Sequence, residues 1–462
     1  MREMSCRLLV IGAGPGGYVC AIRAGQLGVD TIVVDPEPPG GTCLNVGCIP
    51  SKALIHAADE FHRIARLAAA PAMGIAATGA TIDLAATTAW KDGIVSKLTG
   101  GVAGLLRKAG ARLVAGEARL RDGKTAVVST PEGPVMIHAE LLVIATGSEP
   151  VELPSLPFGG RVISSNDALA LTGLPESLAV VGGGYIGLEL GTAFAKLGSR
   201  VTVIEAAPRI LPQYDAELTR PVMQRLAALG VRVLTGARAG GMSATGALRV
   251  ALADGAEDIV AEKVLVTVGR RPRGAGAGIA ELRLEMDGPF LKIDDRCRTS
   301  MRGVHAIGDV TGEPMLAHRA MAQGAMVAEI AAGKPRAWDH RAIPAVCFTD
   351  PEIVSAGLSP EEAQRQGVEV VTGLFPFSAS GRAMTSGRED GFVRVTARKD
   401  SGEVLGIHAV GAGVSELAAG FALALEMGAG LEDVAGTIHA HPTRGEALHE
   451  AGLRAMGRAL HI

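Results

Sequence analysis

Two copies of one glycine-rich pattern constrain the fold of this chain more than any other feature of its sequence. Each copy runs from an apolar strand through Gly-x-Gly-x-x-Gly into a helical stretch, then into a second strand that ends in an acid. The copies span residues 7–35 and 178–205, and in each the acid follows the first glycine by 23 positions (12 to 35 and 182 to 205). The glycines and the acid are Gly12, Gly14, Gly17 and Asp35 in the first copy, and Gly182, Gly184, Gly187 and Glu205 in the second.

One such pattern alone is a weak signal, but two copies with the same surroundings predict two dinucleotide-binding βαβ units. The glycines let a pyrophosphate approach the N-terminus of the helix, and the acid binds a ribose diol. The competing interpretation is that the glycines serve only tight packing of helix against strand. Two nucleotide sites in one chain suggest two cofactors that exchange electrons. Glu205 favours a free 2′-hydroxyl, and therefore NAD over NADP.

The chain of 462 residues is too long for a single core and predicts about three domains. Each unit ends in an apolar strand that runs into glycine, and a third such strand ends in Gly308-Asp309 and returns the chain to the first domain. Beyond residue 346, Phe392–Ala397 alternates like a half-buried strand, Val404–Val410 is its expected partner, and Ser415–Met427 is an expected helix. The predicted fold class is α/β, with two Rossmann-like domains and a C-terminal α+β domain for dimerisation. The predicted boundaries are 1–147 (first domain, first part), 148–269 (second domain), 270–345 (return segment) and 346–462 (interface domain).

Composition excludes several classes of function. Hydrophobic residues make up 48% and charged residues 20% of the chain, as in ordinary soluble proteins. A net charge of -3 gives no reason to expect binding to nucleic acid or to a membrane surface. The apolar N-terminal run is soon broken by glycines and a proline, and it predicts a strand entering a turn rather than a signal peptide or a membrane span. Six cysteines in so long a chain predict a cytoplasmic protein rather than a secreted disulfide scaffold.

Residues 40–52, GGTCLNVGCIPSK, place two cysteines five positions apart. Metal ligands, a structural disulfide, inert thiols and a redox couple are the alternatives. No second cysteine or histidine pair lies near enough in sequence to complete a zinc site, so no metal is expected. On a regular helix the two Cα atoms would be about 8–9 Å apart, beyond the roughly 7 Å limit for a disulfide. A bond therefore requires Leu44–Gly47 to leave helical geometry, which Asn45 and Gly47 permit.

The two cysteines are expected to differ in reactivity. Pro50 suits the first turn of the helix that follows, so Cys48 would lie at a helix N-terminus, where the dipole stabilises a thiolate. Lys52 adds a positive charge one turn further on. A pair that can bridge, with one thiol primed in this way, indicates a redox couple.

A redox dithiol requires a group that accepts its proton. His441 precedes Pro442, which disfavours helical geometry at the histidine, so the imidazole would project from a turn. Glu446, on the next helix, is positioned to orient it. The alternative is structural, because Thr443 and Glu446 also fit a capping box.

Taken together, these residues resemble the flavin disulfide oxidoreductases along essentially the whole chain. The motifs GGTCLNVGCIPSKAL, ATGS, GGGYIGLE, VTVGRRP, AIGDV, MLAH and TIHAHPT occur in the order found in that family. The resemblance implies FAD on the first domain, NAD on the second and a homodimer built through the C-terminal domain. It also implies that the histidine acts on the disulfide of the partner subunit.

The resemblance implies a role for individual residues. Cys43 would exchange with substrate, Cys48 would contact the flavin, His441 would accept the thiol proton and Glu446 would hold it. Lys52 and Glu189 would pair beside the flavin, and Tyr185 would screen it until nicotinamide binds, unless its role is only packing. The residues expected to bind FAD are Gly12, Gly14, Gly17, Asp35, Gly41, Thr42, Lys52, Gly116, Thr146, Gly147, Ser148, Asp309, Met315, Ala317 and His318. Those expected to bind NAD are Gly182, Gly184, Tyr185, Gly187, Glu189, Glu205 and Gly269.

Within this family the chain is most similar to the dihydrolipoamide dehydrogenases, whose partners are the lipoyl domain and acyltransferase core of a 2-oxo acid dehydrogenase complex. Over its whole length it resembles most the forms that serve branched-chain oxo acids. Glutathione reductase usually has arginines where Glu205 stands, and mercuric reductase needs an extra cysteine pair where this chain reads MGRALHI. A non-catalytic flavin scaffold is a further alternative. The chain departs from the family at Gly445, usually serine, and at Asp35, where glutamate is commoner.

Overall fold

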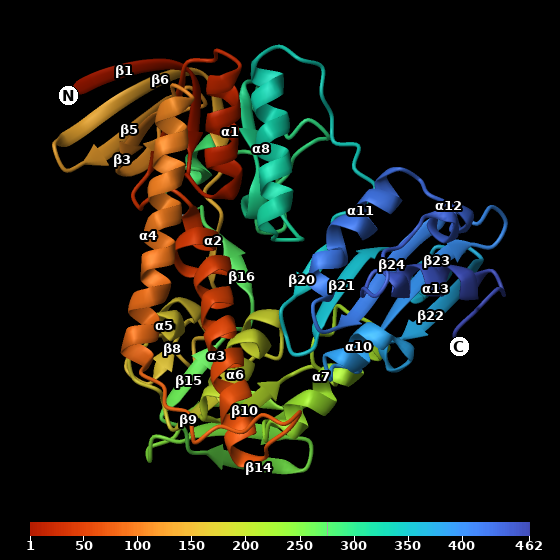
Figure 1. The fold of residues 1–462 in the computed structure, drawn as a ribbon. Helices are drawn as coiled ribbons and strands as arrows, with labels where there is room; N and C mark the ends of the chain where they lie inside the picture. Colours follow the sequence, from red (N-terminus) through yellow and green to blue (C-terminus); the bar gives the residue numbers. More distant parts are fainter. Residues whose placement is uncertain (275) are drawn as a thin grey trace.

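The first glycine-rich unit forms a seven-stranded sheet at one end of the molecule (Figure 1). The structure, a computed structural model, describes residues 1–274 and 276–462. The strands lie in the order β3-β2-β1-β6-β5-β4, with β19 beside β6. Their bounds are β1 Arg2–Ile11, β2 Thr31–Asp35, β3 Arg112–Ala115, β4 Glu117–Leu120, β5 Thr125–Thr130, β6 Gly133–Ile144 and β19 Val304–Ala306.

The central strand β1 is apolar along its second half because both of its faces are covered. It runs parallel to β2 on one side and to β6 on the other. Leu8 and Val10 pack against three helices, and Leu9 and Ile11 pack into a second cluster that includes residues of β4 and β5. The helices are α1 Pro15–Gln26, α4 Leu84–Lys108 and α8 Ala317–Ala331. A strand buried on both faces shows a continuous apolar run rather than alternation.

The second glycine-rich unit forms a five-stranded sheet in the order β11-β10-β9-β15-β8. A three-stranded antiparallel sheet, β12-β13-β14, packs against it through a shared core cluster. The strands of the first sheet are β8 Val162–Ile163, β9 Ser177–Val181, β10 Arg200–Glu205, β11 Arg232–Thr235 and β15 Lys263–Val266. The remaining elements are β12 Arg238–Met242, β13 Leu248–Leu252, β14 Gly255–Ile259, α5 Ser165–Leu169, α6 Tyr185–Leu197 and α7 Ala216–Ala228.

The chain crosses between these two domains through a short antiparallel ladder. Strand β7, Ser148–Pro150, leaves the first domain, and β16, Arg270–Pro272, returns to it beside β7. The boundaries predicted at 147/148 and 269/270 fall at the starts of these two strands. The return segment contains η1 Ala280–Leu282, β17 Met286–Asp287, β18 Phe290–Leu291 and η2 Gly308–Thr311.

The C-terminal domain is built on a five-stranded antiparallel sheet in the order β20-β21-β24-β23-β22 (blue in Figure 1). The boundary predicted at 346 falls inside its first strand. The strands are β20 Ala345–Cys347, β21 Glu352–Gly357, β22 Val370–Pro376, β23 Phe392–Arg398 and β24 Val404–Gly411. The helices are α9 Pro360–Arg365, α10 Gly381–Thr385, α11 Ala418–Glu426, α12 Leu431–Gly436 and α13 Glu446–Ala455, with η3 Phe377–Ala379 and η4 Val414–Leu417. Together the three units confirm the predicted fold class.

Two details of the C-terminal domain differ from the sequence predictions. Strand β23 was predicted to be half-buried, but its first six residues, 392–397, are all buried. Its polar Arg394 lies inside the protein because it forms an ion pair with Asp215 at the start of α7, across the domain boundary. The helix expected over 415–427 begins as the 3-10 turn η4 and becomes α-helical at Ala418.

Helix α3, Cys48–Ala69, lies where the three domains meet. It packs on α4 of the first domain and on α6 of the second (Figure 1). Leu54 and Ala58 of α3 belong to the same core cluster as Leu178 and Phe194 of the second domain, and that cluster also contains Ile353 of the C-terminal domain. Residues at the start of α3 are thereby fixed by all three domains. In the described part of the chain, no helix combines the length and the apolar character needed to cross a bilayer.

Candidate active site

The cysteine segment consists of two helices separated by one glycine. Helix α2 spans Gly41–Val46, α3 begins at Cys48, and Gly47 lies between them with φ -137° and ψ -110°. The prediction that Leu44–Gly47 leaves helical geometry was too broad, because only Gly47 does so. The Asn45 amide donates to the carbonyls of Pro38 (2.9 Å) and Gly41 (3.0 Å), which holds α2 in its helical turn.

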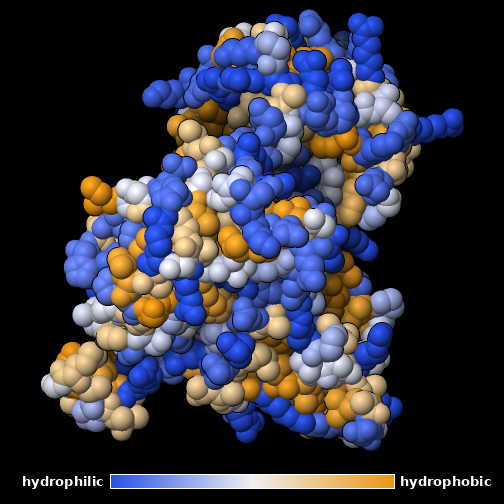
Figure 2. Space-filling view, turned by 90° about the vertical axis from the view of Figure 1, so that its right-hand side faces the viewer, coloured by the Kyte–Doolittle hydropathy of each residue, from blue (hydrophilic) through white to orange (hydrophobic). Residues whose placement is uncertain are grey.

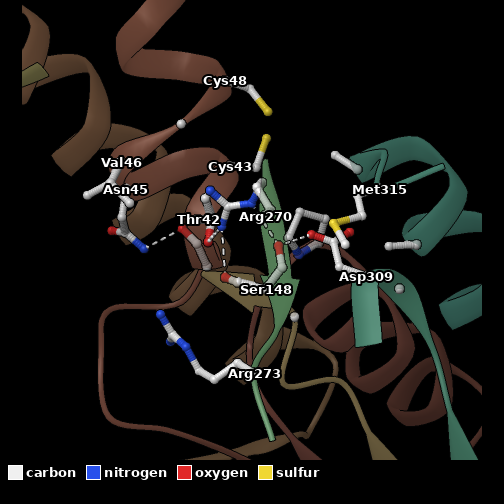
Figure 3. Close-up of a pocket in the computed structure, with 18 of the residues that line it drawn as sticks. Thr42, Cys43, Asn45, Val46, Cys48, Ser148, Arg270, Arg273, Asp309 and Met315 are labelled. Carbon is white, nitrogen blue, oxygen red and sulfur yellow. Dashed lines mark hydrogen bonds between the residues drawn. The ribbon is translucent and has the colours of Figure 1, made fainter. Parts of the chain in front are cut away.

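The two sulfurs point toward one another, one from each helix (Figure 3). Both cysteines are free thiols, which is the reduced form of the pair. A hydrogen bond from the Cys43 thiol lowers the pKa of Cys48 to about 7; burial opposes this shift, and the nearby Lys52 ammonium supports it. The same interaction raises the pKa of Cys43, so the pair carries its negative charge on Cys48. The two thiols therefore differ in the sense that the sequence predicted.

Lys52 lies one turn into α3 and forms an ion pair with Glu189 of α6, with Nζ and Oε2 2.8 Å apart. The Glu189 side chain is only 4% exposed, and its other oxygen accepts the amide of Phe348 at 2.8 Å. The Phe348 ring lies 4.5 Å from the Lys52 ammonium. A buried carboxylate is tolerated here because each of its oxygens has a donor. All three domains thus contribute to this ion pair.

A cavity of about 480 Å³ extends from the cysteine pair past the first glycine loop to Asp35. Most residues predicted to bind FAD line it, as do Tyr185 and both cysteines. The predicted residues that line it are Gly12, Gly14, Asp35, Gly41, Thr42, Cys43, Cys48, Lys52, Thr146, Gly147, Ser148, Tyr185, Glu189, Asp309, Met315 and Ala317. A lining that runs from the glycine loop and Asp35 to the cysteine pair suits an extended dinucleotide with a redox-active ring at the cysteine end.

The glycines of the first loop have different physical roles. Gly12 has a φ of +103°, and a Cβ there would lie 2.3 Å from the carbonyl oxygen of Ala145. A Cβ on Gly17 would lie 1.8 Å from the oxygen of Gly12, so this glycine allows α1 to approach the strand. At Gly14 the nearest heavy atom would be 3.8 Å away, which leaves room in front of the helix N-terminus. Such an open cradle of main-chain N–H groups fits a pyrophosphate.

The second loop repeats this division. A Cβ on Gly182 would lie 2.5 Å from the Thr267 oxygen, and a Cβ on Gly187 would lie 2.2 Å from the Gly182 oxygen. A Cβ on Gly184 would meet no atom within 4 Å. The cradle at Gly184 therefore also fits a pyrophosphate. Gly269, at the start of the return crossover, has a φ of +132° and likewise leaves open space. Both loops satisfy the steric requirement of a dinucleotide.

Asp35 and Glu205 make the same pair of hydrogen bonds despite their difference in length. One oxygen of Asp35 accepts the Ala13 amide at 2.6 Å, and the other accepts the Glu37 amide at 2.9 Å. Glu205 accepts the amides of Gly183 and Ala207, both at 2.6 Å. Each acid is thereby fixed beside its loop, with further lone pairs free to accept ribose hydroxyls. The aspartate in the first copy does not disturb the arrangement.

A hydrogen-bonded group beside the cysteines contains one residue that the sequence did not predict (Figure 3). The Ser148 hydroxyl donates to Asp309 at 2.5 Å. Arg270 donates to the Ser148 hydroxyl and carbonyl, both at 2.8 Å, and reaches Thr42 at 3.4 Å. Burial lowers the pKa of Arg270, and Asp309 opposes this effect. The residue that the sequence did not predict is Arg270. Its position directly after the glycine of the motif VTVGRRP was the available signal.

Three residues predicted to bind FAD do not line the cavity. Gly17 lies behind the loop, as described above. Gly116 donates its amide to the Asp35 carbonyl at 3.0 Å, and a Cβ there would lie 2.4 Å from the Ser129 oxygen. His318 lies close to the Pro344 carbonyl, 2.7 Å from Nε2. Gly17 and Gly116 thus lie behind Gly12 and Asp35, which do line the cavity.

His441 and Glu446 lie in the C-terminal domain and do not line the cavity of their own chain. Nδ1 of His441 is 2.7 Å from Oε1 of Glu446, and the imidazole is 79% exposed. Glu446 also accepts the Thr443 amide at 2.7 Å. Burial would raise the pKa of Glu446, but these hydrogen bonds hold it below its usual value. Gly445, the departure from the family pattern, immediately precedes α13 and leaves this contact intact.

The fold, the paired glycine loops and the dithiol at the end of the cavity define an oxidoreductase that couples a dithiol to dinucleotide cofactors. A family model described as pyridine nucleotide-disulphide oxidoreductase matches residues 6–324, and the model of the corresponding dimerisation domain matches residues 343–452. The chain belongs to the pyridine nucleotide-disulphide oxidoreductase family.

Several curated relatives match the chain along nearly its whole length. The dihydrolipoyl dehydrogenase of Pseudomonas aeruginosa is 58% identical over 98% of both chains. The dihydrolipoyl dehydrogenase of Geobacillus stearothermophilus is 44% identical over 98% of this chain and 97% of its own. Among solved structures, LpdA from Mycobacterium tuberculosis superposes with a TM-score of 0.89 at 28% identity, covering 97% of this chain and 99% of its own. The flavoprotein disulfide reductase RclA from Escherichia coli, at 24% identity, shares the fold with a TM-score of 0.85 over 96% of this chain and 99% of its own.

Proposed function

We propose that this chain is a dihydrolipoyl dehydrogenase, which oxidises dihydrolipoamide with NAD⁺ through a Cys43–Cys48 disulfide and FAD. The observation that carries the proposal is the cysteine pair at the end of the 480 Å³ cavity, beside the Lys52–Glu189 pair. Relatives of 43–58% identity bear that name. FAD and NAD are the cofactors of the family. The first glycine loop would hold FAD and the second would hold NAD.

The cysteines carry the exchange with substrate. A substrate thiolate attacks the Cys43 sulfur of the disulfide, and Cys48 leaves as a thiolate, which its lowered pKa of about 7 favours. The second substrate thiol, once deprotonated, then attacks the mixed disulfide, which closes lipoamide and releases Cys43. FAD, when bound, supplies the two-electron chemistry between the reduced pair and NAD⁺.

His441 of one subunit would accept the substrate proton at Nε2, because its Nδ1 is held by Glu446. Lys52 and Glu189 would keep a fixed charge pair beside the flavin. Gly12, Gly14 and Asp35 would hold FAD, whereas Gly182, Gly184 and Glu205 would hold NAD. Tyr185, at the first position of α6 and on the cavity wall, would separate the two until nicotinamide binds.

Homodimerisation follows from the matched dimerisation domain. The exposed imidazole of His441 supports the expectation that it completes the site of the partner subunit. The C-terminal domain also exposes large apolar side chains, namely Met384, Leu423, Met427 and Ile438. Figure 2 shows hydrophobic areas interrupting the hydrophilic surface on the side of the molecule where this domain lies. A subunit interface would bury such side chains.

The proposal extends to the lipoyl domain and acyltransferase core of a 2-oxo acid dehydrogenase complex as partners, and to a cytoplasmic location. Service to branched-chain oxo acids remains a prediction from overall resemblance. NADPH-linked activity is disfavoured at the second loop, since Glu205 occupies the ribose position. The guanidinium of Arg209, four residues after Glu205, donates hydrogen bonds to the carbonyls of Pro212 and Tyr214.

Anaerobic titration of the flavin spectrum tests this function. Two electrons from dihydrolipoamide should produce a long-wavelength charge-transfer band, because the Cys48 thiolate would contact the oxidised flavin. NAD⁺ should then discharge the band, and NADP⁺ should not. No spectral response to the dithiol would refute the assignment, and a response to glutathione instead would favour a different reductase of the family.

A further inference from the structure

Asp350 is a buried carboxylate that joins two domains through three cations. Its Oδ2 lies 2.8 Å from Lys196 of α6 and 2.9 Å from Arg225 of α7, and its Oδ1 pairs with Arg388 of the C-terminal domain. The side chains of Asp350 and Lys196 are only 8% and 5% exposed. Burial alone would raise the pKa of Asp350, but these cations hold it well below its usual range. The carboxylate therefore anchors its segment to the second domain.

The same segment carries the contacts to the Lys52–Glu189 pair. Phe348, two residues before Asp350, donates its amide to Glu189 and places its ring 4.5 Å from the Lys52 ammonium. Between them, Thr349 is buried and donates its hydroxyl to the Pro351 carbonyl at 2.8 Å, which stiffens the turn. Glu189, Phe348 and Asp350 also line one small cavity of about 80 Å³. A displacement of Asp350 would therefore move Phe348 relative to Glu189.

We propose that Asp350 is a positioning residue for the Lys52–Glu189 pair, and that it acts through Phe348. The inference rests on the proposed function, in which that pair lies beside the flavin. Asp350 does not line the larger cavity. Its effect would be to keep the ammonium of Lys52 at a fixed place near the Cys48 thiolate.

The expected direction of the effect follows from the charges around Cys48. The groups that face it are the Cys43 thiol, the Lys52 ammonium and the Glu189 carboxylate, with the Tyr18 and Tyr185 hydroxyls and the Arg270 guanidinium close by. Lys52 lowers the pKa of Cys48 more than Glu189 raises it. Loosening this ion pair should therefore raise the pKa of Cys48.

The test uses Asp350→Asn in the FAD-loaded Cys43→Ser protein, where Cys48 is the remaining thiol of the pair. The charge-transfer absorbance is titrated against pH, and alkylation of Cys48 by iodoacetamide supplies the midpoint if the band is weak. We expect the midpoint to rise by about half a pH unit or more. In the otherwise wild-type protein, hydrogen exchange of the Phe348 amide should quicken by about tenfold or more, because the segment that carries this amide is no longer anchored to the second domain.

Asp215→Asn is the matched control. Asp215 also forms a buried ion pair between α7 and the C-terminal domain, with Arg394 of β23. In the sheet, β21 and β24 separate β23 from β20, the strand that directly precedes Phe348. Asparagine preserves the helix cap that Asp215 provides. This variant should lose stability while its Cys48 midpoint and its Phe348 exchange stay at the parent values.

An unchanged midpoint or an unchanged Phe348 exchange in Asp350→Asn would overturn the proposal, and so would an equal shift in Asp215→Asn. If Asp350→Asn does not fold, Arg388→Gln decides, since it removes one cation from the same carboxylate and should move both readouts in the same direction by less. These measurements use neither dihydrolipoamide nor NAD⁺. A wild-type protein without lipoamide turnover would therefore refute the proposed function and leave this inference standing.

Discussion

Glu446 holds His441 with one carboxylate oxygen and the amide of Thr443 with the other, both at 2.7 Å. The sequence allowed two interpretations, an oriented imidazole or a capping box. The structure contains the first contact and half of the second: the Thr443 hydroxyl donates to the Ala440 carbonyl, and α13 begins after Gly445 without a side-chain cap. The carboxylate is fixed by the main chain, so it fixes the ring in turn.

Replacement of His441 by Gln should collapse dihydrolipoamide oxidation by about 10²–10⁴-fold, because the substrate thiol loses its proton acceptor. FAD content should not change, since His441 lies outside the cavity of its own chain. His340→Gln is the control: this exposed histidine of the return segment also contacts a glutamate, Glu426, at 3.2 Å. Wild-type turnover in His441→Gln would leave the imidazole with a structural role only.

Cys48→Ser should keep FAD and lose lipoamide turnover, because no disulfide can form with Cys43. Turnover is measured with dihydrolipoamide and NAD⁺, and flavin content by its visible absorbance. Cys6→Ser, in a buried cysteine of β1, should keep both properties. If Cys48→Ser turned over dihydrolipoamide as fast as wild type, the disulfide mechanism would be refuted.

Arg270→Lys should weaken FAD binding by about tenfold or more, because lysine cannot reproduce the two hydrogen bonds that the guanidinium makes to Ser148. The dissociation constant is measured by rebinding FAD to the apoprotein. Arg271→Lys is the neighbouring control, since Arg271 is exposed and pairs with Glu149. Equal FAD affinity in the two variants would contradict the role assigned to Arg270.

Gly184→Ala and Gly187→Ala should fail in different ways. A methyl group at Gly184 meets no atom of the protein, so the variant should fold and bind NAD⁺ about tenfold more weakly. At Gly187 the methyl would lie 2.2 Å from the Gly182 oxygen, so that variant should not form the second domain. Circular dichroism and NAD⁺ titration separate the two outcomes. Normal NAD⁺ affinity in Gly184→Ala would place the pyrophosphate elsewhere.

Acid should destabilise the protein through His408. This imidazole is buried, and burial together with nearby Arg394 lowers its pKa to about 4, against the opposing charges of Asp215 and Glu362. Only the unfolded chain binds the proton between about pH 6.5 and 4, so the free energy of unfolding should fall by about 1.4 kcal/mol per pH unit there. His408→Leu should remove this contribution in urea denaturation series.

Burial also lowers the pKa of His305 to about 4. His305 should therefore still contribute to the pH dependence of the unfolding free energy in His408→Leu. The unfolding free energy of His408→Leu should fall less steeply with acid than that of wild type. Equal slopes would show that His408 is not buried in its neutral form.

The sequence predicted the parts of the site that local spacing determines. The glycine loops, their acids and the cysteine segment were all visible because each lies within a short stretch whose conformation is set by its own residues. Arg270 and Phe348 were not, because their contacts join segments more than a hundred residues apart. The full burial of strand β23 was missed for the same reason, because the partner of its Arg394, Asp215, lies on another domain.

Gly47 gives the redox chemistry a mechanical constraint. Cys43 and Cys48 belong to two helices, and the only residue between those helices is this glycine. Making and breaking a bond between the sulfurs changes their separation, and the torsions of one residue are where the backbone can absorb that change. A side chain there would press on the Thr42 carbonyl, 2.8 Å from its Cβ. Gly47 thus acts as a single-residue hinge between the two helices that carry the sulfurs.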